Sequence, residues 1–363
     1  MLKLFIRRSK STMIASALFF YFGCIFTYSI NNLKCTEAMD TIAKDELSNS
    51  LSKYEYAVLV ISGPNNEAKR DAIRTTWGKL SNNIFTENGE ILYKWNHTRI
   101  EQQTQENIIK FYFVLGTQGL SDSVMSKLKN ENSRSSDLLL LNSFEDRYEN
   151  LATKMVHSLR WISTNMRSLK YLIKCDDDSF VRVDLIIRHL EAYAPNMDDP
   201  ALSEYISFKK NLPSNKGLYW GYFHGRARVL SSGKWKDTDW FLCNNYLPYA
   251  LGGGYIISRS IVDFIARNAD FLSVYNSEDV SMGVWTASLD AINRVHDIRF
   301  DTQWKTRGCS NHMLIRHKQS PHDMFQLYKT LVHTQGEKLC KIETFEMEPY
   351  MYKWNVLPSN CCT

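Results

Sequence analysis

Three consecutive carboxylates, Asp176, Asp177 and Asp178, follow the apolar run 171–173 after two intervening residues. That run has the length and composition of a buried strand. Adjacent carboxylates at the end of such a strand repel one another unless a cation neutralises them. Oxygen ligands favour a hard divalent ion such as Mg²⁺ or Mn²⁺, and a metal with open positions can hold a diphosphate. An acidic turn or a helix cap would explain the same residues equally well when they are taken alone.

Strand and helix patterns alternate through the first half of the chain. Strands are expected at 56–62, 108–116, 137–141 and 171–173, and helices at 65–77, 121–132 and 148–165. In the last of these helices Leu151, Met155 and Leu159 share one face. Alternating β and α units predict a mostly parallel sheet covered by helices, in which ligands bind at the carboxyl ends of the strands. The three aspartates fall at such an end, which favours the metal site over the cap.

The N-terminal segment 11–30 is uncharged and long enough to span a bilayer as a helix. Basic residues precede it, so the positive-inside rule places the N-terminus in the cytosol and the rest of the chain in the lumen. A cleaved signal peptide is the alternative, but the run is long for one and no clear cleavage site follows. We therefore expect a cytoplasmic tail (1–10), a transmembrane signal anchor (11–30), a stem (31–53) and one lumenal domain (54–363).

Cysteines and a glycosylation triplet agree with a lumenal domain. Asn96 begins the sequon Asn-His-Thr, within an insertion at 81–105 to which we assign no role. Seven of the eight cysteines follow the anchor, so at least one is free or pairs between chains. Cys175, on the apolar strand, is expected to be a buried free thiol, and the adjacent Cys361 and Cys362 are each expected to pair elsewhere. Basic residues are dispersed and the net charge is only +5, so nothing supports nucleic-acid binding.

The second half of the chain is rich in aromatic residues and glycine. Rings between Trp220 and Tyr249 are suited to stacking on sugars, although an ordinary core explains most of them. Gly252–Gly254 precede an expected strand at 255–257 and indicate close approach of a ligand or another segment, or a tight turn.

Several charged residues have a structural and a chemical interpretation. Asp279, in the first turn of an expected helix, either favours the helix dipole or acts as a general base. Arg70 and Arg74 share a helix face that is either solvated or able to hold an anion. His296 is either an ordinary histidine or a ligand that completes a carboxylate metal site.

The chain resembles the beta-1,3-glycosyltransferases of glycosyltransferase family 31. The shared motifs, in family order, are RDAIRTTWG (70–78), FVLG (113–116), YENLATK (148–154), KCDDDSF (174–180) and EDV (278–280). Within that family, the second half is similar to the beta-1,3-galactosyltransferases of the glycosaminoglycan linkage region. Those segments are 218–223, 225–226, 245–255, 277–281, 299–302, 307–311, 317–320 and 361–362. One departure is Cys175, where a small non-thiol residue is usual.

The resemblance implies a GT-A fold, a single α/β domain with a mostly parallel central sheet flanked by helices and preceded by the transmembrane helix. It implies an inverting site with Asp279 as the base and with Mn²⁺ bound by Asp178 and His296. It assigns donor and acceptor contacts as well. The donor residues would be Ser62, Arg70, Arg74, Asp176 and Asp177, and the acceptor residues Trp220, Tyr249, Gly253 and Glu278.

The implied reaction is transfer of galactose from UDP-galactose to the galactosyl-beta-1,4-xylosyl acceptor on proteoglycan core proteins, in the Golgi membrane. A beta-1,3-N-acetylglucosaminyltransferase or a generic beta-1,3-galactosyltransferase of the same family is the alternative. From other classes, a non-catalytic lumenal glycan-binding protein and a metal phosphohydrolase are further alternatives. The latter lacks its D-x-D-x-T nucleophile pattern, because Ser179 and Phe180 follow the aspartates.

Overall fold

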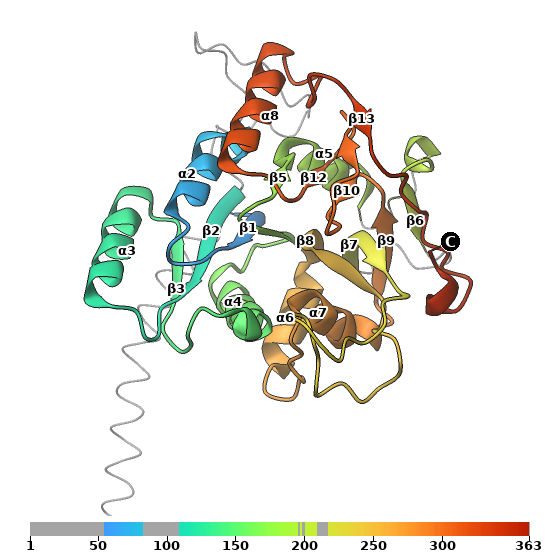
Figure 1. The fold of residues 1–363 in the computed structure, drawn as a ribbon, viewed down its shortest axis with the longest axis horizontal. Helices are drawn as coiled ribbons and strands as arrows, with labels where there is room; N and C mark the ends of the chain where they lie inside the picture. Colours follow the sequence, from blue (N-terminus) through green and yellow to red (C-terminus); the bar gives the residue numbers. More distant parts are fainter. Residues whose placement is uncertain (1–53, 83–108, 195–196, 198–199, 209–216, 363) are drawn as a thin grey trace, which may run out of the picture. The chain divides into compact units, whose positions relative to one another are not determined.

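The computed structural model describes residues 54–82, 109–194, 197, 200–208 and 217–362 (Figure 1). The expected anchor and stem, and the sequon at Asn96, lie outside these residues. Within the described part of the chain, no helix is both long enough and apolar enough to cross a bilayer.

An eight-stranded sheet forms the centre of the fold. Its strands, in spatial order, are β3 (Leu138–Leu141), β2 (Ile109–Gly116), β1 (Tyr56–Ile61), β4 (Tyr171–Asp176), β8 (Tyr249–Ser258), β7 (Gly217–His224), β9 (Ile292–Asp297) and β6 (Ile206–Phe208). β8 is antiparallel to both of its neighbours, and β6 is antiparallel to β9; the other pairs are parallel. All six residues of β1 are buried, as expected of a strand covered on both faces. The predicted mostly parallel, helix-flanked α/β sheet is confirmed.

Helices cover both faces of this sheet (Figure 1). One face carries α4 (Leu151–Asn165), α6 (Arg259–Asn268) and α7 (Glu278–Ala287), and the other carries α2 (Glu67–Thr75), α3 (Asp122–Ser135), α5 (Val183–Tyr193) and α8 (Pro321–His333). Short 3₁₀ turns are η1 (Trp77–Asn82), η2 (Tyr148–Asn150), η3 (Pro200–Leu202) and η4 (Pro358–Asn360). The alternate β1 residues Tyr56, Val58 and Val60 pack into the core beneath the second helix group. The helix expected at 148–165 is found as the 3₁₀ turn η2 followed directly by α4.

The three glycines differ from expectation. Gly252–Gly254 do not precede a strand but lie inside β8, where Gly254 pairs with Cys175 of β4. The strand continues through the glycines because β4 pairs with residues 254–258 and β7 pairs with residues on both sides of the run. The sequence pattern was wrong about the boundary, and the close approach that it indicated is found within the strand.

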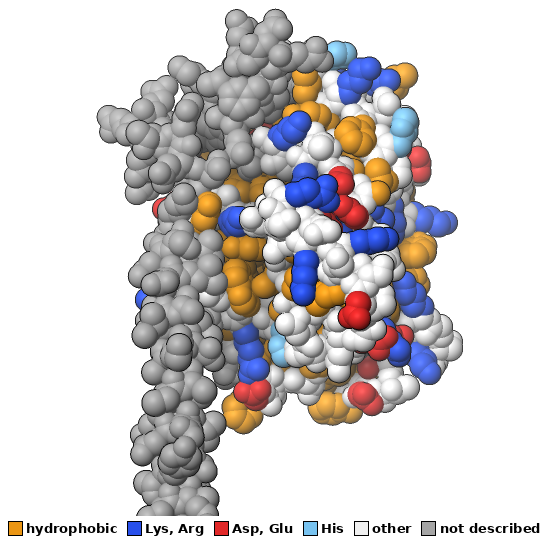
Figure 2. Space-filling model, turned by 90° about the vertical axis from the view of Figure 1, so that its left-hand side faces the viewer, with side chains coloured by type: hydrophobic (Ala, Val, Ile, Leu, Met, Phe, Trp, Pro, Cys, Tyr) orange, Lys and Arg blue, Asp and Glu red, His pale blue; other side chains and the backbone are white. Residues whose placement is uncertain are grey.

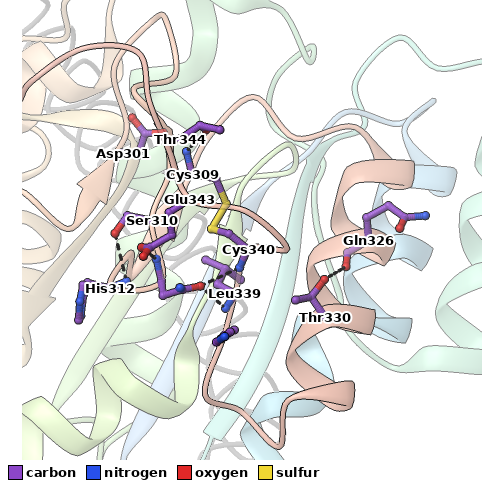
Figure 3. The surroundings of a disulfide bond; sticks show 12 residues. Asp301, Cys309, Ser310, His312, Gln326, Thr330, Leu339, Cys340, Glu343 and Thr344 are labelled. Atoms are coloured by element: carbon purple, nitrogen blue, oxygen red, sulfur yellow. Dashed lines mark hydrogen bonds between the residues drawn. A yellow bond between two sulfur atoms is a disulfide. The ribbon is translucent and has the colours of Figure 1, made fainter.

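Two small sheets and two disulfides complete the described chain. β10 (Phe300–Asp301), β12 (Ile315–Arg316) and β5 (Phe180–Val181) form one sheet, and β11 (Gly308–Cys309) pairs with β13 (Thr344–Phe345). The Cys309–Cys340 disulfide joins β11 to the segment that precedes β13, and backbone N–H groups of Leu339 and Cys340 donate to Asn311 Oδ1. Figure 3 shows this crosslink beside α8.

Cys361 and Cys362 are bonded to each other, which corrects the expectation that each pairs elsewhere. Both are buried. The free thiols among the described residues are Cys175, inside β4, and Cys243, on an exposed loop. The predicted buried free thiol at Cys175 is confirmed.

Charge is mixed on the face that Figure 2 shows. Lys and Arg side chains are interspersed there with Asp and Glu and do not form one patch. The net charge of the chain is thus not concentrated in one patch on this face.

Replacing Cys309 and Cys340 together by Ala should lower the free energy of unfolding by about 2–4 kcal/mol, because the unfolded chain regains loop entropy. The two cysteines are 31 positions apart. Denaturant titration of the oxidised protein measures the change, and Cys243→Ala, which removes an exposed free thiol, serves as the control. Equal midpoints for the double variant and the control would contradict the expectation.

Candidate active site

A cavity of about 750 Å³ opens at the carboxyl ends of β1 and β4. One end is formed by Ser62, Gly63 and Asn66 together with the three aspartates, and the other by the segment 227–235 with Tyr246 and Tyr249. Ile61 at the end of β1 pairs with Asp176 at the end of β4, so the acidic motif begins where both strands end. This is where a mostly parallel sheet binds its ligands.

Asp176, Asp178 and His317 form a cluster whose ligand atoms all lie within 4.8 Å of one another. His317 Nε2 is 3.0 Å from Asp178 Oδ1 and 3.5 Å from Asp176 Oδ2. Neither ring nitrogen of His317 nevertheless makes a well-formed hydrogen bond with a described residue. Burial opposes protonation of His317, but the two carboxylates raise its pKa to about 9. Two carboxylates and one imidazole fit a divalent cation such as Mn²⁺, which tolerates one nitrogen ligand.

The segment before α8 holds His317 in this place. Lys318 has a φ of 60°, a left-handed conformation that is uncommon for a residue with a Cβ. The next backbone N–H, of Gln319, donates to Asp178 O at 2.8 Å. Ser320 then caps α8 in a capping box with Asp323, and Pro321 begins the helix. The helix start therefore fixes the chain that carries His317.

The glycines of β8 make room for the site. A Cβ on Gly253 would lie 2.6 Å from His317 Nδ1, and one on Gly252 would lie 3.2 Å from Asp279 Oδ2. A Cβ on Gly254 would lie 2.7 Å from Ile315 Cδ1. The close approach predicted for this run is thus to other parts of the chain, and two of the three positions adjoin chemically important side chains.

A buried lysine connects the acidic cluster to α7. Lys174 Nζ donates to Asp176 Oδ1 at 3.0 Å, to Glu278 Oε2 at 2.9 Å and to Gly252 O at 2.5 Å. Burial alone would lower its pKa, but Asp176 and Glu278 hold the pKa of Lys174 above that of free lysine. Tyr255 Oη donates to the other oxygen of Glu278. Both oxygens of Glu278 are therefore occupied, although the residue lines the cavity.

Asp279 differs from its neighbour Glu278. It is half-buried, and its carboxylate accepts backbone N–H bonds from Gly252 and Val280, both at 2.9 Å. Burial and the adjacent Glu278 raise the pKa of Asp279 to about 6, despite opposing contributions from Lys174 and the two N–H groups. Adjacent carboxylates in unlike environments can take different roles. Asp279 is thus the carboxylate in this pair that suits proton transfer.

His296 is not a metal ligand in this structure. It is fully buried in β9; its Nδ1 accepts from Phe223 N at 3.0 Å, and its Nε2 lies 2.9 Å from Tyr350 O. Because Nδ1 accepts, Nε2 carries the proton and donates. Burial lowers the pKa of His296 to about 4, so the ring is neutral. His317 occupies the position in the cluster that the resemblance assigned to His296.

Arg70 and Arg74 do not line the cavity. The buried Arg70 guanidinium pairs with both oxygens of Glu131, at 2.7 and 2.6 Å. Arg74 bonds to Glu131 and, through two nitrogens, to Asp137. Their charge is neutralised within the fold, although Arg70 Nη1 also donates to Ser62 Oγ and Gly63 O at the cavity wall. The donor role of both arginines stays a prediction.

Of the remaining predicted residues, some line the cavity and one does not. Ser62 lines the cavity but donates to Asp177, whose carboxylate also accepts from Asn66 and Lys69. Asp177 therefore braces β4 against α2. Tyr249 and Gly253 line the cavity as predicted. Trp220 does not, because it is fully buried with its indole N–H donating to Asp297 at 3.0 Å.

Sequence reasoning missed three residues of the site. These are His317, Lys174 as a charge bridge, and Trp304, whose ring is 64% exposed at the cavity. His317 belongs to a segment that the family resemblance included, and Lys174 directly precedes the acidic motif, so both carried a signal. Trp304 had none, since an isolated tryptophan is ordinarily part of a core.

The sequence model of the galactosyltransferase family matches residues 68–297. Beta-1,3-galactosyltransferase 6 of Mus musculus is 36% identical over 329 residues, covering 91% of this chain and 89% of that one. Hydroxyproline O-galactosyltransferase GALT2 of Arabidopsis thaliana is 29% identical, over 77% of this chain but only 35% of its own length. The chain belongs to the galactosyltransferase family.

A solved structure, a mannosyltransferase from Pyrobaculum calidifontis in complex with GDP-Man and Mn²⁺, aligns with 12% identity and a TM-score of 0.30. That alignment covers 66% of this chain and 56% of the other. A TM-score of this size is too low to relate the two sites.

Asp178→Ala should abolish Mn²⁺-dependent UDP binding, and His317→Ala should weaken it less, because a neutral ligand contributes less than a carboxylate. His296→Ala should destabilise the protein and leave the metal affinity of the folded fraction unchanged. Titration calorimetry with UDP, with and without Mn²⁺, measures this. His322→Ala, an exposed histidine of α8, is the matched control. Metal-dependent binding that persists in His317→Ala and is lost in His296→Ala would refute the cluster.

Asp279→Asn should lower the turnover rate by about 10²–10⁴-fold with little change in UDP affinity, because it removes the proton acceptor and keeps the shape. In the unmodified protein the rate should rise with pH through about 6, where Asp279 loses its proton. A pH–rate profile of both forms checks this. The low-pH limb should disappear in Asp279→Asn; an identical limb in both would assign the titration to another group.

Proposed function

We propose that this protein is an inverting beta-1,3-galactosyltransferase that transfers galactose from UDP-galactose to a galactosyl-beta-1,4-xylosyl acceptor on proteoglycan core proteins. The observation that carries the proposal is one cavity that contains both a cation-binding cluster and an aspartate free to accept a proton. The similarity to the mouse beta-1,3-galactosyltransferase, over nine tenths of both chains, supports the linkage and the donor. The similarity of the second half to the linkage-region enzymes supports the acceptor.

The donor diphosphate is assigned to the end of the cavity with the cluster. Asp176, Asp178 and His317 would hold Mn²⁺ there, and a bound metal supplies Lewis-acid neutralisation of the departing diphosphate. Lys318 Nζ, 3.3 Å from Asp178 Oδ2, adds positive charge beside it. Ser62 and Gly63 form the adjoining wall at the end of β1.

Proton transfer is assigned to Asp279. Its carboxylate takes the proton of the acceptor 3-hydroxyl while that oxygen forms a bond to the anomeric carbon. The bond from this carbon to the diphosphate oxygen breaks on the opposite face, and UDP leaves with the electron pair. An α-linked donor thereby gives a β-1,3 bond. Glu278 has both carboxylate oxygens bonded, one to Lys174 and one to Tyr255, and does not compete for the proton.

The acceptor is assigned to the aromatic side chains of the cavity wall. Trp235 and Trp304 lie edge to face, with ring centroids 4.9 Å apart, and Lys318 Nζ lies 5.2 Å from the Trp304 centroid. Tyr249 also lines the cavity. Aromatic rings in a cavity wall give a sugar an apolar surface at low entropy cost.

The proposal includes a cellular setting. The uncharged segment 11–30 would anchor the chain as a single-pass type II protein of the Golgi membrane, with the catalytic domain in the lumen. Protease protection in sealed microsomes tests the orientation. Digestion of the domain without detergent would refute it.

A panel of acceptors tests the proposed reaction. With UDP-galactose and Mn²⁺, galactosyl-xyloside should be used in preference to galactosyl-glucoside and N-acetylglucosaminide, because recognition has to depend on the xylose. Preference for N-acetylglucosaminide would instead indicate a generic beta-1,3-galactosyltransferase. UDP-N-acetylglucosamine as competing donor separates the N-acetylglucosaminyltransferase alternative, and UDP binding with no transfer to any acceptor would indicate a non-catalytic glycan-binding protein.

A further inference from the structure

We propose that a second cavity, walled by the C-terminal segment, binds a neutral sugar unit of the acceptor away from the reacting hydroxyl. This inference rests on the proposed function. The cavity measures about 460 Å³, which is within the range of small-molecule sites. It is lined by His224, Arg226, Gln303, Met347, Glu348, Pro349, Tyr350, Met351 and Cys362.

Residues that line the second cavity are next in sequence to residues that line the first. Arg226 lines the second, and the next residues, Ala227 and Arg228, line the first. Gln303 likewise lines the second, and its neighbours Thr302 and Trp304 line the first. Two chain segments therefore contribute neighbouring residues to both cavities, and the proposal is that a ligand of more than one sugar contacts both.

Two polar atoms at this cavity lack partners. His224 Nδ1 and Gln303 Oε1 are buried and make no hydrogen bond with any described residue. Gln303 is itself held in place, because its Nε2 donates to Tyr222 Oη at 3.0 Å. Buried polar atoms without partners are costly, and they are found where a ligand or water completes them. Burial lowers the pKa of His224 to about 4, so a neutral ring faces the ligand at ordinary pH.

The remaining lining residues define the ligand class. Arg226 and Glu348 carry opposite charges, so neither an anion nor a cation is favoured overall. Met347, Pro349 and the disulfide at Cys362 give apolar surface between these polar groups. Paired donors and acceptors with apolar surface between them suit hydroxyl groups on a pyranose ring.

The wall of the cavity is rigidly attached to the sheet. Tyr350 Oη donates to Phe223 O at 2.7 Å, and His296 Nε2 donates to Tyr350 O at 2.9 Å. A Cβ on Gly225 would clash with Tyr352 Oη and Cys361 Sγ, at 2.4 and 3.1 Å. The site is thus formed before a ligand arrives, and His296 acts as a positioning residue for it.

Glu348→Ala and Arg226→Ala test the inference, with Glu346→Ala as the control on the same exposed segment. The readout is KM for galactosyl-beta-1,4-xyloside and for a simple aryl beta-galactoside. Each test variant should raise the disaccharide KM by about tenfold, the effect of losing one hydrogen bond to a charged group. The kcat, the aryl galactoside KM, the UDP-galactose KM and the melting temperature should not change. Equal disaccharide KM values in all three variants and the unmodified protein would overturn the inference.

Direct binding separates this result from failure of the proposed function. Galactosyl-xyloside is titrated into the full-length protein without donor, and its proton signals are followed by saturation-transfer NMR. Xylose signals that weaken in Glu348→Ala and not in Glu346→Ala support the site even if no galactose is transferred. Xylose signals that are identical in the two variants overturn it even if transfer is normal.

Discussion

The ammonium group of Lys174 is the interaction on which the active site depends. It is buried in β4 and bonds to Asp176, to Glu278 of α7 and to the backbone of β8. A buried charge is costly unless it is paired and its hydrogen bonds are satisfied, and here all three donors of the group are used. The same contacts join three elements distant in sequence, so the acidic motif, the glycine strand and the base-bearing helix are fixed together.

This arrangement also separates the roles of two adjacent carboxylates. Glu278 gives its oxygens to Lys174 and Tyr255 and is committed to holding the structure. Asp279, one residue on, receives only backbone N–H bonds and is left with a raised pKa. Sequence alone named both residues and had no means of ranking them beyond the resemblance. The ranking comes from which side of the helix start faces Lys174, a tertiary property.

Patterns of local origin were predicted well. The expected strands and helices from β1 to β4, and the helix α7, appear near the expected positions, since periodicity and apolar content act over a few residues. For the glycine run the close approach was predicted, but the start of the strand was not. The bounds of β8 depend on its pairing with β4 and β7 and not on its own composition. The pairing of Arg70 and Arg74 with Glu131 was not predicted, since Glu131 lies on a different helix and sequence spacing carries no information about it.

The two histidines show the same limit most clearly. His296 lies within β9 and His317 directly follows β12, and the sequence around each is compatible with a metal ligand. Only the register of β9 beside β7 brings His296 against the backbone of Phe223, and only the left-handed residue before the α8 cap brings His317 to the aspartates. The buried ring of His296 has a positioning role, because its hydrogen bond to Tyr350 O holds the C-terminal segment. The two histidines thus link the sheet to opposite ends of one binding region, the metal end through His317 and the far wall through His296.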